Sequence, residues 1–451
     1  MQRAHIIGIG GSVMHAMAIH LQSAGYIVTG SDNRIEDPAR SRLSEKGLLP
    51  EKEGWFPERI SSELSFVLLG MHARADNPEL LRAQELRLPI WDMPTFVARA
   101  ARQKHRIVVA GSHGKTTTTA LLIYAFQRLG IPTDWLIGAP TPALSTTFHL
   151  SEAPTFIFEG DEYPASVLNP QPKAAVYQPH WLILTGIAWD HINVYPTPES
   201  YLSAFEHILQ NLPKGGICFY NATDPTVKML VEKVLRPGWQ TAIPYQGLPY
   251  IQKGGRWFVR LGQRVIPVRF WGRHNVLNAS AVWRVLQEFF VEDREFAEIL
   301  STFELPFQRQ TVWYQSSDKV VVRDFAHAPS KVQAVIEAVQ ETFPKLPLTV
   351  VLELHTYSSL KPVYAAQYQK VLRSAKGESW IYLDEKIAWE KGSDPQALQV
   401  ALGKGKGIRW FYEVESLKAA LREAFTQRPG VILLLSSGSF GGLTPQDIGI
   451  P

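Results

Sequence analysis

The sequence is almost without cysteine and has no long apolar run. Cys218 is the only cysteine among 451 residues, so no disulfide can form within the chain, and we predict a reducing, cytoplasmic location. No segment approaches the roughly 18–20 apolar residues that cross a bilayer. The first residues lead into a strand rather than into an apolar signal segment. We therefore expect no membrane partner.

The chain also carries little net charge. Its formal net charge is +4, and the basic residues are scattered along the sequence. Proteins that bind nucleic acid usually concentrate lysine and arginine on one face or in one stretch of sequence. We therefore expect no nucleic acid partner, whereas small anionic substrates suit this balance. The sequence leaves the oligomeric state open.

Apolar residues make up 45% and charged residues 20% of the chain, which is typical of globular proteins. Because the chain is too long for one ordinary core, we predict three domains, at residues 1–105, 106–308 and 309–451. Short apolar runs alternate with helical patterns, which favours an α/β fold with parallel sheets. Strands are expected at residues 5–9, 26–29, 66–69, 107–110, 155–158, 182–185, 319–322, 348–352, 380–383 and 431–435, with hairpins at 250–269. Helices are expected at residues 14–21, 78–88, 118–129, 199–212 and 276–290.

A glycine-rich turn after the strand at 107–110 is the strongest chemical signal. It reads Gly111, Ser112, His113, Gly114, Lys115, Thr116 and Thr117. A strand, a glycine loop and a helix that opens with Lys-Thr direct backbone N–H groups at phosphate oxygens. Lys115 would reach the β- and γ-phosphates of a nucleoside triphosphate, and the Thr116 hydroxyl would bind Mg²⁺. The strict motif has glycine where this chain has Val109, and a plain turn into a helix is the alternative.

Acidic and histidine residues follow two further predicted strands. Glu159 stands directly after one strand, and Asp190-His191 follows the next. Ligands of parallel α/β sheets gather at the carboxyl ends of strands, so Glu159 and His191 are candidate partners of a phosphate-bound Mg²⁺. Histidine is an unusual Mg²⁺ ligand, and an acidic loop that faces solvent is the alternative reading.

A second glycine turn lies near the N-terminus. Gly8, Gly10 and Gly11 follow the first strand, but Val13 stands where a dinucleotide fingerprint has its third glycine. Asp32 follows the second strand at a distance suited to a ribose or a base. A nicotinamide cofactor, a UDP-sugar and a tight structural turn all remain open on these residues alone.

Five motifs in order resemble the Mur ligases over essentially the whole chain. They are Gly-Ser-His-Gly-Lys-Thr-Thr at 111–117, Glu-Gly-Asp-Glu-Tyr at 159–163, Asp-His at 190–191, Gly-Arg-His-Asn-Val-Leu-Asn-Ala at 272–279 and Asp-Phe-Ala-His at 324–327. The resemblance implies an N-terminal Rossmann-like domain for UDP-N-acetylmuramate. It further implies a central ATPase domain and a C-terminal Rossmann-like domain that carries the amine substrate and closes on ATP.

The same resemblance assigns roles to particular residues. The UDP-sugar diphosphate would lie against Gly8, Gly10, Gly11, Ser12 and Asp32. Asn275 and Asn278 would lie near the adenine, Arg309 near the ATP phosphates and Asp324 near the ribose. His327 would support Asp324 or orient the amine.

Within the family, residues 159–163, 187–197 and 437–442 resemble the murein peptide ligases. These join UDP-N-acetylmuramate to L-alanyl-γ-D-glutamyl-meso-diaminopimelate through an acyl-phosphate. Ala328 replaces a frequent second histidine, Thr185 replaces an asparagine, and residues 354–357 lack a frequent arginine. An L-alanine-adding ligase is the alternative, and a non-catalytic nucleotide-binding protein is the alternative of another class.

Overall fold

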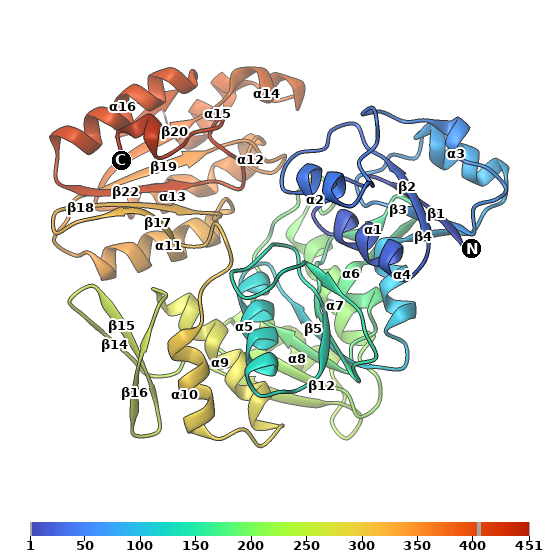
Figure 1. Ribbon diagram of the computed structural model, residues 1–451. Coiled ribbons are helices and arrows are strands. Elements are labelled where there is room, and N and C mark those ends of the chain that lie inside the picture. The colour runs from blue at the N-terminus through green and yellow to red at the C-terminus, as the bar shows by residue number, and fades with distance from the viewer. Residues whose placement is uncertain (1, 404–406, 451) are drawn as a thin grey trace. The chain divides into compact units, whose positions relative to one another are not determined.

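The computed structural model describes residues 2–403 and 407–450 and has the predicted α/β class (Figure 1). The chain forms two compact units. The first comprises Met1–Ile187, Leu202–Gln246 and Ala281–Phe290, and the second comprises Ala188–Tyr201, Gly247–Ser280 and Val291–Pro451. A β-sheet lies in each of the three regions predicted to be domains. The domain boundaries near residues 105 and 308 stay a prediction. Among the described residues, no helix has the length and apolar character needed to cross a membrane.

The N-terminal sheet of the first unit is parallel throughout, in the order β2-β1-β3-β4. Its strands are β1 (Arg3–Ile7), β2 (Ile27–Ser31), β3 (Phe66–Leu69) and β4 (Ile90–Asp92). Its helices are α1 (Met14–Ser23), α2 (Ala39–Glu45), α3 (Pro78–Glu85) and α4 (Met93–Ala100). Local sequence fixes two helix starts, because the side chains of Asn77 and Asp92 accept backbone N–H groups of the first turns of α3 and α4.

A seven-stranded sheet follows in the same unit, in the order β13-β12-β11-β5-β8-β6-β7. Its strands are β5 (His105–Ala110), β6 (Thr133–Leu136), β7 (Phe148–His149), β8 (Thr155–Glu159), β11 (Trp181–Leu184), β12 (Ile217–Asn221) and β13 (Thr241–Tyr245). Only β7 pairs antiparallel. The chain leaves β5 toward β6 but leaves β11 toward β12, so the connections diverge between β5 and β11. In such sheets ligands bind at the carboxyl ends of those two strands.

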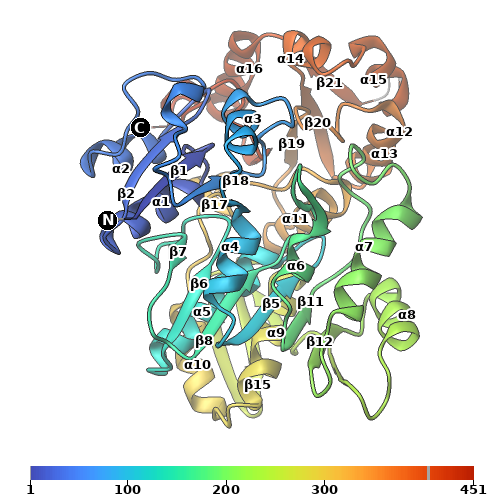
Figure 2. The ribbon, with the colours of Figure 1, turned by 90° about the vertical axis from the view of Figure 1, so that its right-hand side faces the viewer.

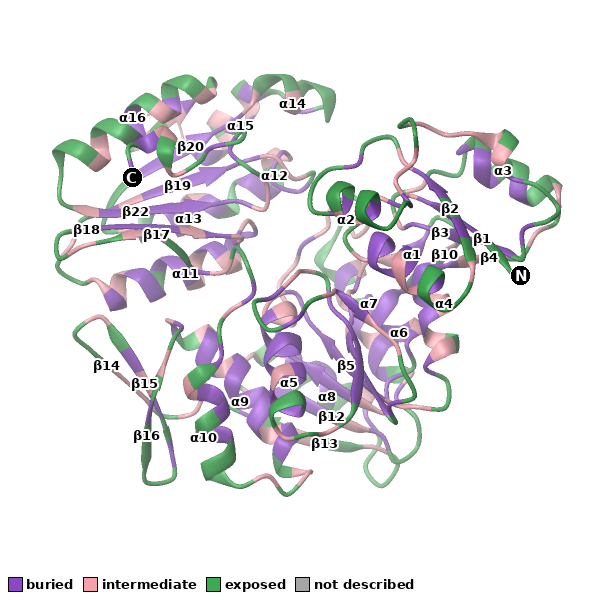
Figure 3. Cartoon of the chain, viewed as in Figure 1, coloured by how far each residue is buried: buried purple, intermediate pink, exposed green. Residues whose placement is uncertain are grey.

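Helices pack beside this sheet, and two short strands form a separate two-stranded antiparallel sheet. The helices are α5 (Lys115–Arg128), α6 (Lys173–Val176) and α8 (Pro225–Val234), while α7 (Pro198–Gln210) and α9 (Arg273–Gln287) each have residues in both units. The short strands are β9 (Pro164–Ser166) and β10 (Asn169–Pro172). Figure 2 shows β6, β8 and β5 as neighbouring strands with α5 beside them. The strand centres are buried while the outer faces of the helices are exposed (Figure 3). Burial of these apolar runs is the main stabilising contribution.

The second unit contains a six-stranded sheet in the order β17-β18-β22-β19-β20-β21, in which only β17 is antiparallel. Its strands are β17 (Thr311–Gln315), β18 (Lys319–Asp324), β19 (Leu348–Glu353), β20 (Gly377–Tyr382), β21 (Ile408–Phe411) and β22 (Gly430–Leu435). One face packs on α11 (Pro329–Thr342), α12 (Pro362–Ala365), α13 (Gln367–Arg373), α14 (Glu385–Glu390) and α15 (Pro395–Leu402). The other face packs on α16 (Val414–Gln427).

The predicted hairpins at 250–269 form a three-stranded antiparallel sheet of β14 (Tyr250–Lys253), β15 (Arg256–Leu261) and β16 (Arg264–Val268). α10 (Asp293–Thr302) follows in the same unit. The indole Nε1 of Trp257, on β15, donates to the Thr342 hydroxyl at the end of α11, 2.9 Å away. Both side chains are buried, so this small sheet is held against the C-terminal sheet domain.

Candidate active site

The predicted phosphate loop lies between β5 and α5, at the carboxyl edge where connections diverge. A Cβ at Gly111, whose φ is +135°, would lie 2.2 Å from the Thr185 hydroxyl, so only glycine fits there. Gly114 is left-handed at φ +78° and starts α5 without any side-chain cap. The first-turn N–H groups of α5 therefore lack the side-chain acceptor that usually serves them. This is the arrangement in which a helix start binds phosphate.

Lys115 is held at this loop by carboxylates. Its Nζ donates to Glu162 Oε2 and to the Gly111 carbonyl oxygen, both at 2.6 Å, and lies 3.3 Å from Asp161 Oδ1. Glu162 is fully buried. Burial alone would lower the pKa of Lys115, but the charges of Glu162 and Asp161 outweigh it and raise that pKa. Lys115 is therefore a permanent cation beside the helix start.

Thr116 and Glu159 lie together, as predicted for two Mg²⁺ partners. The Thr116 hydroxyl donates to Glu159 Oε1 at 2.7 Å, and the Gly138 amide donates to Glu159 Oε2 at 2.7 Å. A hydroxyl and a carboxylate next to a phosphate loop are the hard oxygen donors that Mg²⁺ prefers. The residues thus fit the ion, although their roles as its ligands stay a prediction.

The N-terminal glycine turn is shaped by backbone bonds and by Asp32. The amides of Gly8 and Ile9 donate to the Ser31 carbonyl, at 2.8 and 3.1 Å. The Gly10 amide donates to Asp32 Oδ2 at 2.9 Å. Asp32 therefore fixes the turn itself, and its predicted contact with a ligand stays untested by these bonds.

A cavity of about 260 Å³ opens beside this turn. Its lining residues come from the turn, from α1, from α2 and the loop before it, and from a loop of the central sheet: Gly10, Ser12, His15, Arg34, Glu36, Asp37, Pro38, Ala39, Arg42, Pro140 and Thr147. His15 Nδ1 bonds to the Gly11 carbonyl at 2.8 Å, while its buried Nε2 has no protein partner. Burial lowers the pKa of His15, so Nε2 is a free acceptor for a hydroxyl or an imide N–H.

Asp190 and His191 belong to the second unit. Asp190 Oδ1 accepts the His191 amide at 2.7 Å and the Tyr364 hydroxyl at 3.2 Å, and Lys331 Nζ lies 3.5 Å from Oδ2. Burial would raise the pKa of Asp190, but lowering effects, of which the charge of Lys331 is the largest, outweigh it and lower that pKa. His191 has a left-handed φ of +56°. A joint metal site of His191 with Thr116 and Glu159 stays a prediction.

The two predicted adenine contacts lie on adjacent turns of α9. Asn278 Nδ2 donates to Asn275 Oδ1 at 3.2 Å, and Asn275 Nδ2 donates to the Trp271 carbonyl at 3.0 Å. Gln310 binds the same Trp271 backbone through two hydrogen bonds, at 2.8 and 2.9 Å. Sequence reasoning missed Gln310, because no local motif marks a residue that pairs with one 39 positions away.

Asp324 is buried at the end of β18. Its carboxylate accepts the amides of Gln310 and Ala326, both at 2.8 Å, and burial raises its pKa despite nearby Arg309. The Arg309 guanidinium lies 4.2 Å from the Phe325 ring centroid. His327 was predicted to support Asp324 or to orient the amine, and its Nδ1 bonds to the Phe325 carbonyl at 2.9 Å. Burial lowers the pKa of His327 to about 3, so its imidazole is neutral.

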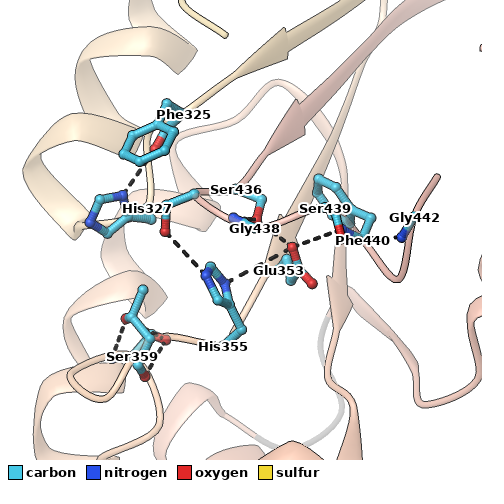
Figure 4. A network of polar contacts seen from close by, with 12 residues as sticks. Phe325, His327, Glu353, His355, Ser359, Ser436, Gly438, Ser439, Phe440 and Gly442 are labelled. Atoms are coloured by element: carbon cyan, nitrogen blue, oxygen red, sulfur yellow. Dashed lines mark hydrogen bonds and ion pairs between the residues drawn. The ribbon is translucent and has the colours of Figure 1, made fainter. Parts of the chain in front are cut away.

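A polar network at the carboxyl ends of β19 and β22 was not foreseen (Figure 4). Glu353 Oε2 accepts the Ser436 hydroxyl and, at 3.0 Å, the Phe440 amide. His355 Nε2 lies 3.2 Å from the Ser437 hydroxyl, and its Nδ1 lies 4.0 Å from Glu353 Oε2. The network fixes the start of the Ser-Gly-Ser-Phe-Gly-Gly segment at 437–442.

Two family models match this chain. Residues 3–105 match the model described as "Mur ligase family, catalytic domain", and residues 109–286 match "Mur ligase middle domain". Together the two matches span more than half of the sequence. The chain belongs to the Mur ligase family. It is therefore an ADP-forming ligase that uses ATP to join a carboxylate to an amine.

Solved structures share the fold of this Mur ligase. A murein peptide ligase from Psychrobacter arcticus is 20% identical with a TM-score of 0.72, covering 100% of this chain and 99% of that one. A UDP-N-acetylmuramate–alanine ligase from Thermotoga maritima is 21% identical with a TM-score of 0.72, covering 98% and 97%. A MurF ligase from Thermotoga maritima, in complex with ADP, is 15% identical with a TM-score of 0.58, covering 84% and 86%.

Proposed function

We propose that this Mur ligase joins UDP-N-acetylmuramate to the amino group of L-alanyl-γ-D-glutamyl-meso-diaminopimelate, a step of peptidoglycan recycling in the cytoplasm. The assignment of UDP-N-acetylmuramate as a substrate rests on the cavity beside the Gly8–Ser12 turn. A buried imidazole nitrogen of His15 lacks a protein partner there. The tripeptide part rests on the murein peptide ligase resemblance of residues 159–163, 187–197 and 437–442.

The chemistry follows from the weakness of a carboxylate as an electrophile. Transfer of the γ-phosphoryl group of ATP to the lactyl carboxylate gives an acyl-phosphate, and the amine then displaces phosphate. Such transfer depends on positioning and charge neutralisation. Lys115 and the start of α5 would hold the triphosphate. Mg²⁺, held by Thr116 and Glu159 and by His191, would neutralise further phosphate charge when bound.

The family resemblance supports roles for four further residues that were predicted from the sequence. In this proposal Asn275 and Asn278 lie near the adenine, Asp324 near the ribose and Arg309 near the phosphates. The buried, neutral His327 would orient the amine rather than exchange a proton with it at neutral pH, because its pKa lies near 3.

The UDP-N-acetylmuramate–L-alanine ligase activity is the second candidate. It is supported by the likeness of the fold to a UDP-N-acetylmuramate–alanine ligase, whose TM-score of 0.72 equals that of the murein peptide ligase. Phosphate release distinguishes the two. The purified protein, ATP, Mg²⁺ and UDP-N-acetylmuramate are mixed with either L-alanine or the tripeptide, and the proposal requires at least about tenfold faster release with the tripeptide. Faster release with L-alanine refutes the tripeptide assignment, and no release with either amine refutes both.

A further inference from the structure

A single loop of the first unit contacts both the N-terminal glycine turn and the phosphate site. Residues 137–147 connect β6 to β7. The Ile137 amide donates to the Thr147 carbonyl at 2.9 Å and closes the loop at its base. Ile137 and Thr147 are buried, at 0% and 1% exposure, so the base of the loop is a fixed part of the central domain.

The first contact of the loop is with Glu159. The Gly138 amide donates to Oε2 at 2.7 Å, while Oε1 of the same carboxylate accepts the Thr116 hydroxyl at 2.7 Å. A Cβ at Gly138 would lie only 3.2–3.4 Å from the Glu159 carboxylate atoms. The backbone at Gly138 and the Glu159 carboxylate therefore fix each other's positions, and a shift of one moves the other.

The second contact is with Ser12 in the glycine turn. The Ser12 hydroxyl donates to the Gly138 carbonyl at 3.2 Å, and the buried Thr147 hydroxyl donates to the Ser12 carbonyl at 2.8 Å. Pro140 and Thr147 line the same cavity as Gly10 and Ser12. A ligand in this cavity therefore lies against both the turn and the loop.

We propose that residues 138–147 are a positioning segment that makes binding of the nucleotide sugar and binding of ATP reinforce each other. A ligand in the cavity fixes Ser12 against the loop and thereby fixes the Gly138 amide on Glu159. The Glu159 carboxylate is then already held at the Thr116 hydroxyl when ATP binds. ATP binding therefore costs less conformational entropy. By linkage, ATP strengthens binding of the nucleotide sugar by the same factor. The inference rests on the proposed function of the two sites.

Calorimetric titration tests this inference without catalysis. The dissociation constant of the non-hydrolysable analogue AMP-PNP, in millimolar Mg²⁺, is measured with and without saturating UDP-N-acetylmuramate. We expect the sugar nucleotide to tighten AMP-PNP binding by at least about fivefold, the lower end of typical coupling between sites. In Thr147→Val the factor is expected to fall below about two, because the shorter of the two hydrogen bonds between the loop and Ser12 is lost while side-chain volume is kept.

The matched control is Thr133→Val. Thr133 is also buried in the first unit, but its hydroxyl donates to the carbonyls of Asp134 and Thr155. This variant is expected to keep the full factor. Ser12→Ala, with its exposed side chain, removes the other hydrogen bond between the turn and the loop without a change in the core. Because Ser12 also lies at the predicted diphosphate site, its factor is measured at a UDP-N-acetylmuramate concentration that saturates this variant.

Each outcome decides the matter. An unchanged factor in both Thr147→Val and Ser12→Ala, or a factor near one in the unaltered protein, overturns the inference while the proposed function stands. A loss of the factor in Thr133→Val also overturns it, because the effect would then be general to buried hydroxyls. A protein that binds neither nucleotide refutes the proposed function and this inference with it.

Discussion

Replacement of Lys115 by methionine tests the physical basis of the phosphate site. The Lys115 ammonium lies 2.6 Å from Glu162 Oε2 and 3.3 Å from Asp161 Oδ1, and Glu162 is fully buried. Removing one partner of a buried ion pair costs about 3–5 kcal/mol of unfolding free energy. Loss of one charged contact to the transferred phosphoryl group lowers turnover by roughly 10²–10³-fold. Lys115→Met should therefore be both less stable and nearly inactive.

A double variant separates the two effects. Lys115→Met with Glu162→Gln removes the cation together with the buried charge that it neutralises. We expect most of the lost melting temperature to return, while ADP release stays low because nothing replaces the ammonium at the phosphates. Lys173→Met is the matched control, since Lys173 Nζ also pairs with Asp161, at 3.4 Å. Its turnover should fall by less than about tenfold, well short of the loss expected for a charged contact to the transferred phosphoryl group, because Lys173 begins α6 and is not part of the phosphate loop.

Two results would refute this reasoning. Near-normal ADP release by Lys115→Met, at saturating ATP and UDP-N-acetylmuramate, would remove Lys115 from the phosphate site. Recovery of turnover together with stability in the double variant would mean that Lys115 acts only through folding. Calorimetric melting and a coupled ADP assay on the same preparations provide both measurements.

Three further perturbations act elsewhere in the molecule. Glu79→Ala removes a buried carboxylate that pairs with His5 Nε2 at 3.3 Å and accepts the Phe56 amide at 2.7 Å, and should cost about 1–3 kcal/mol in urea unfolding at pH 7, because buried polar partners are left unsatisfied; an unchanged unfolding free energy would contradict this role. Burial lowers the pKa of His105 from 6.5 to about 4, so the free energy of unfolding is at its full value above pH 6.5 and falls, by about 2 kcal/mol with solvent screening included, as the pH drops to 4. His105→Phe should flatten that slope, and His149→Gln, at an exposed side chain, should keep it. Arg42→Ala, at the cavity wall, should raise KM for UDP-N-acetylmuramate by about 10–100-fold with kcat nearly unchanged; an unchanged KM would place the diphosphate elsewhere.

The parts of the fold that could be read from sequence are those with strong local patterns. β3 was expected at the residues where it lies, because its four residues are apolar and all buried. β13 and β17 were missed because they are edge strands with mostly exposed residues, and β13 contains Pro244. Edge strands need no apolar pattern and tolerate proline, so their sequences resemble loops.

The candidate site divides in the same way. The loop at 111–117 was predicted in full because its function depends on neighbouring residues along the chain. The Lys115–Glu162 pair and the Gln310–Trp271 bonds were not predicted, since they join residues 47 and 39 positions apart. Such pairs are set by the order of strands in the sheets, and sheet order depends on packing far from either residue. A single sequence offers no local signal for it.

The bond between Trp257 and Thr342 has a practical consequence for chimaeric enzymes. An exchange of C-terminal domains between relatives at residue 309 would pair one parent's Trp257 with a foreign helix surface. Such a hybrid would lose a buried hydrogen bond and expose aromatic surface to water, which favours aggregation. Exchanges that transfer residues 247–280 together with the C-terminal segment keep the Trp257–Thr342 hydrogen bond, because both residues then come from one parent.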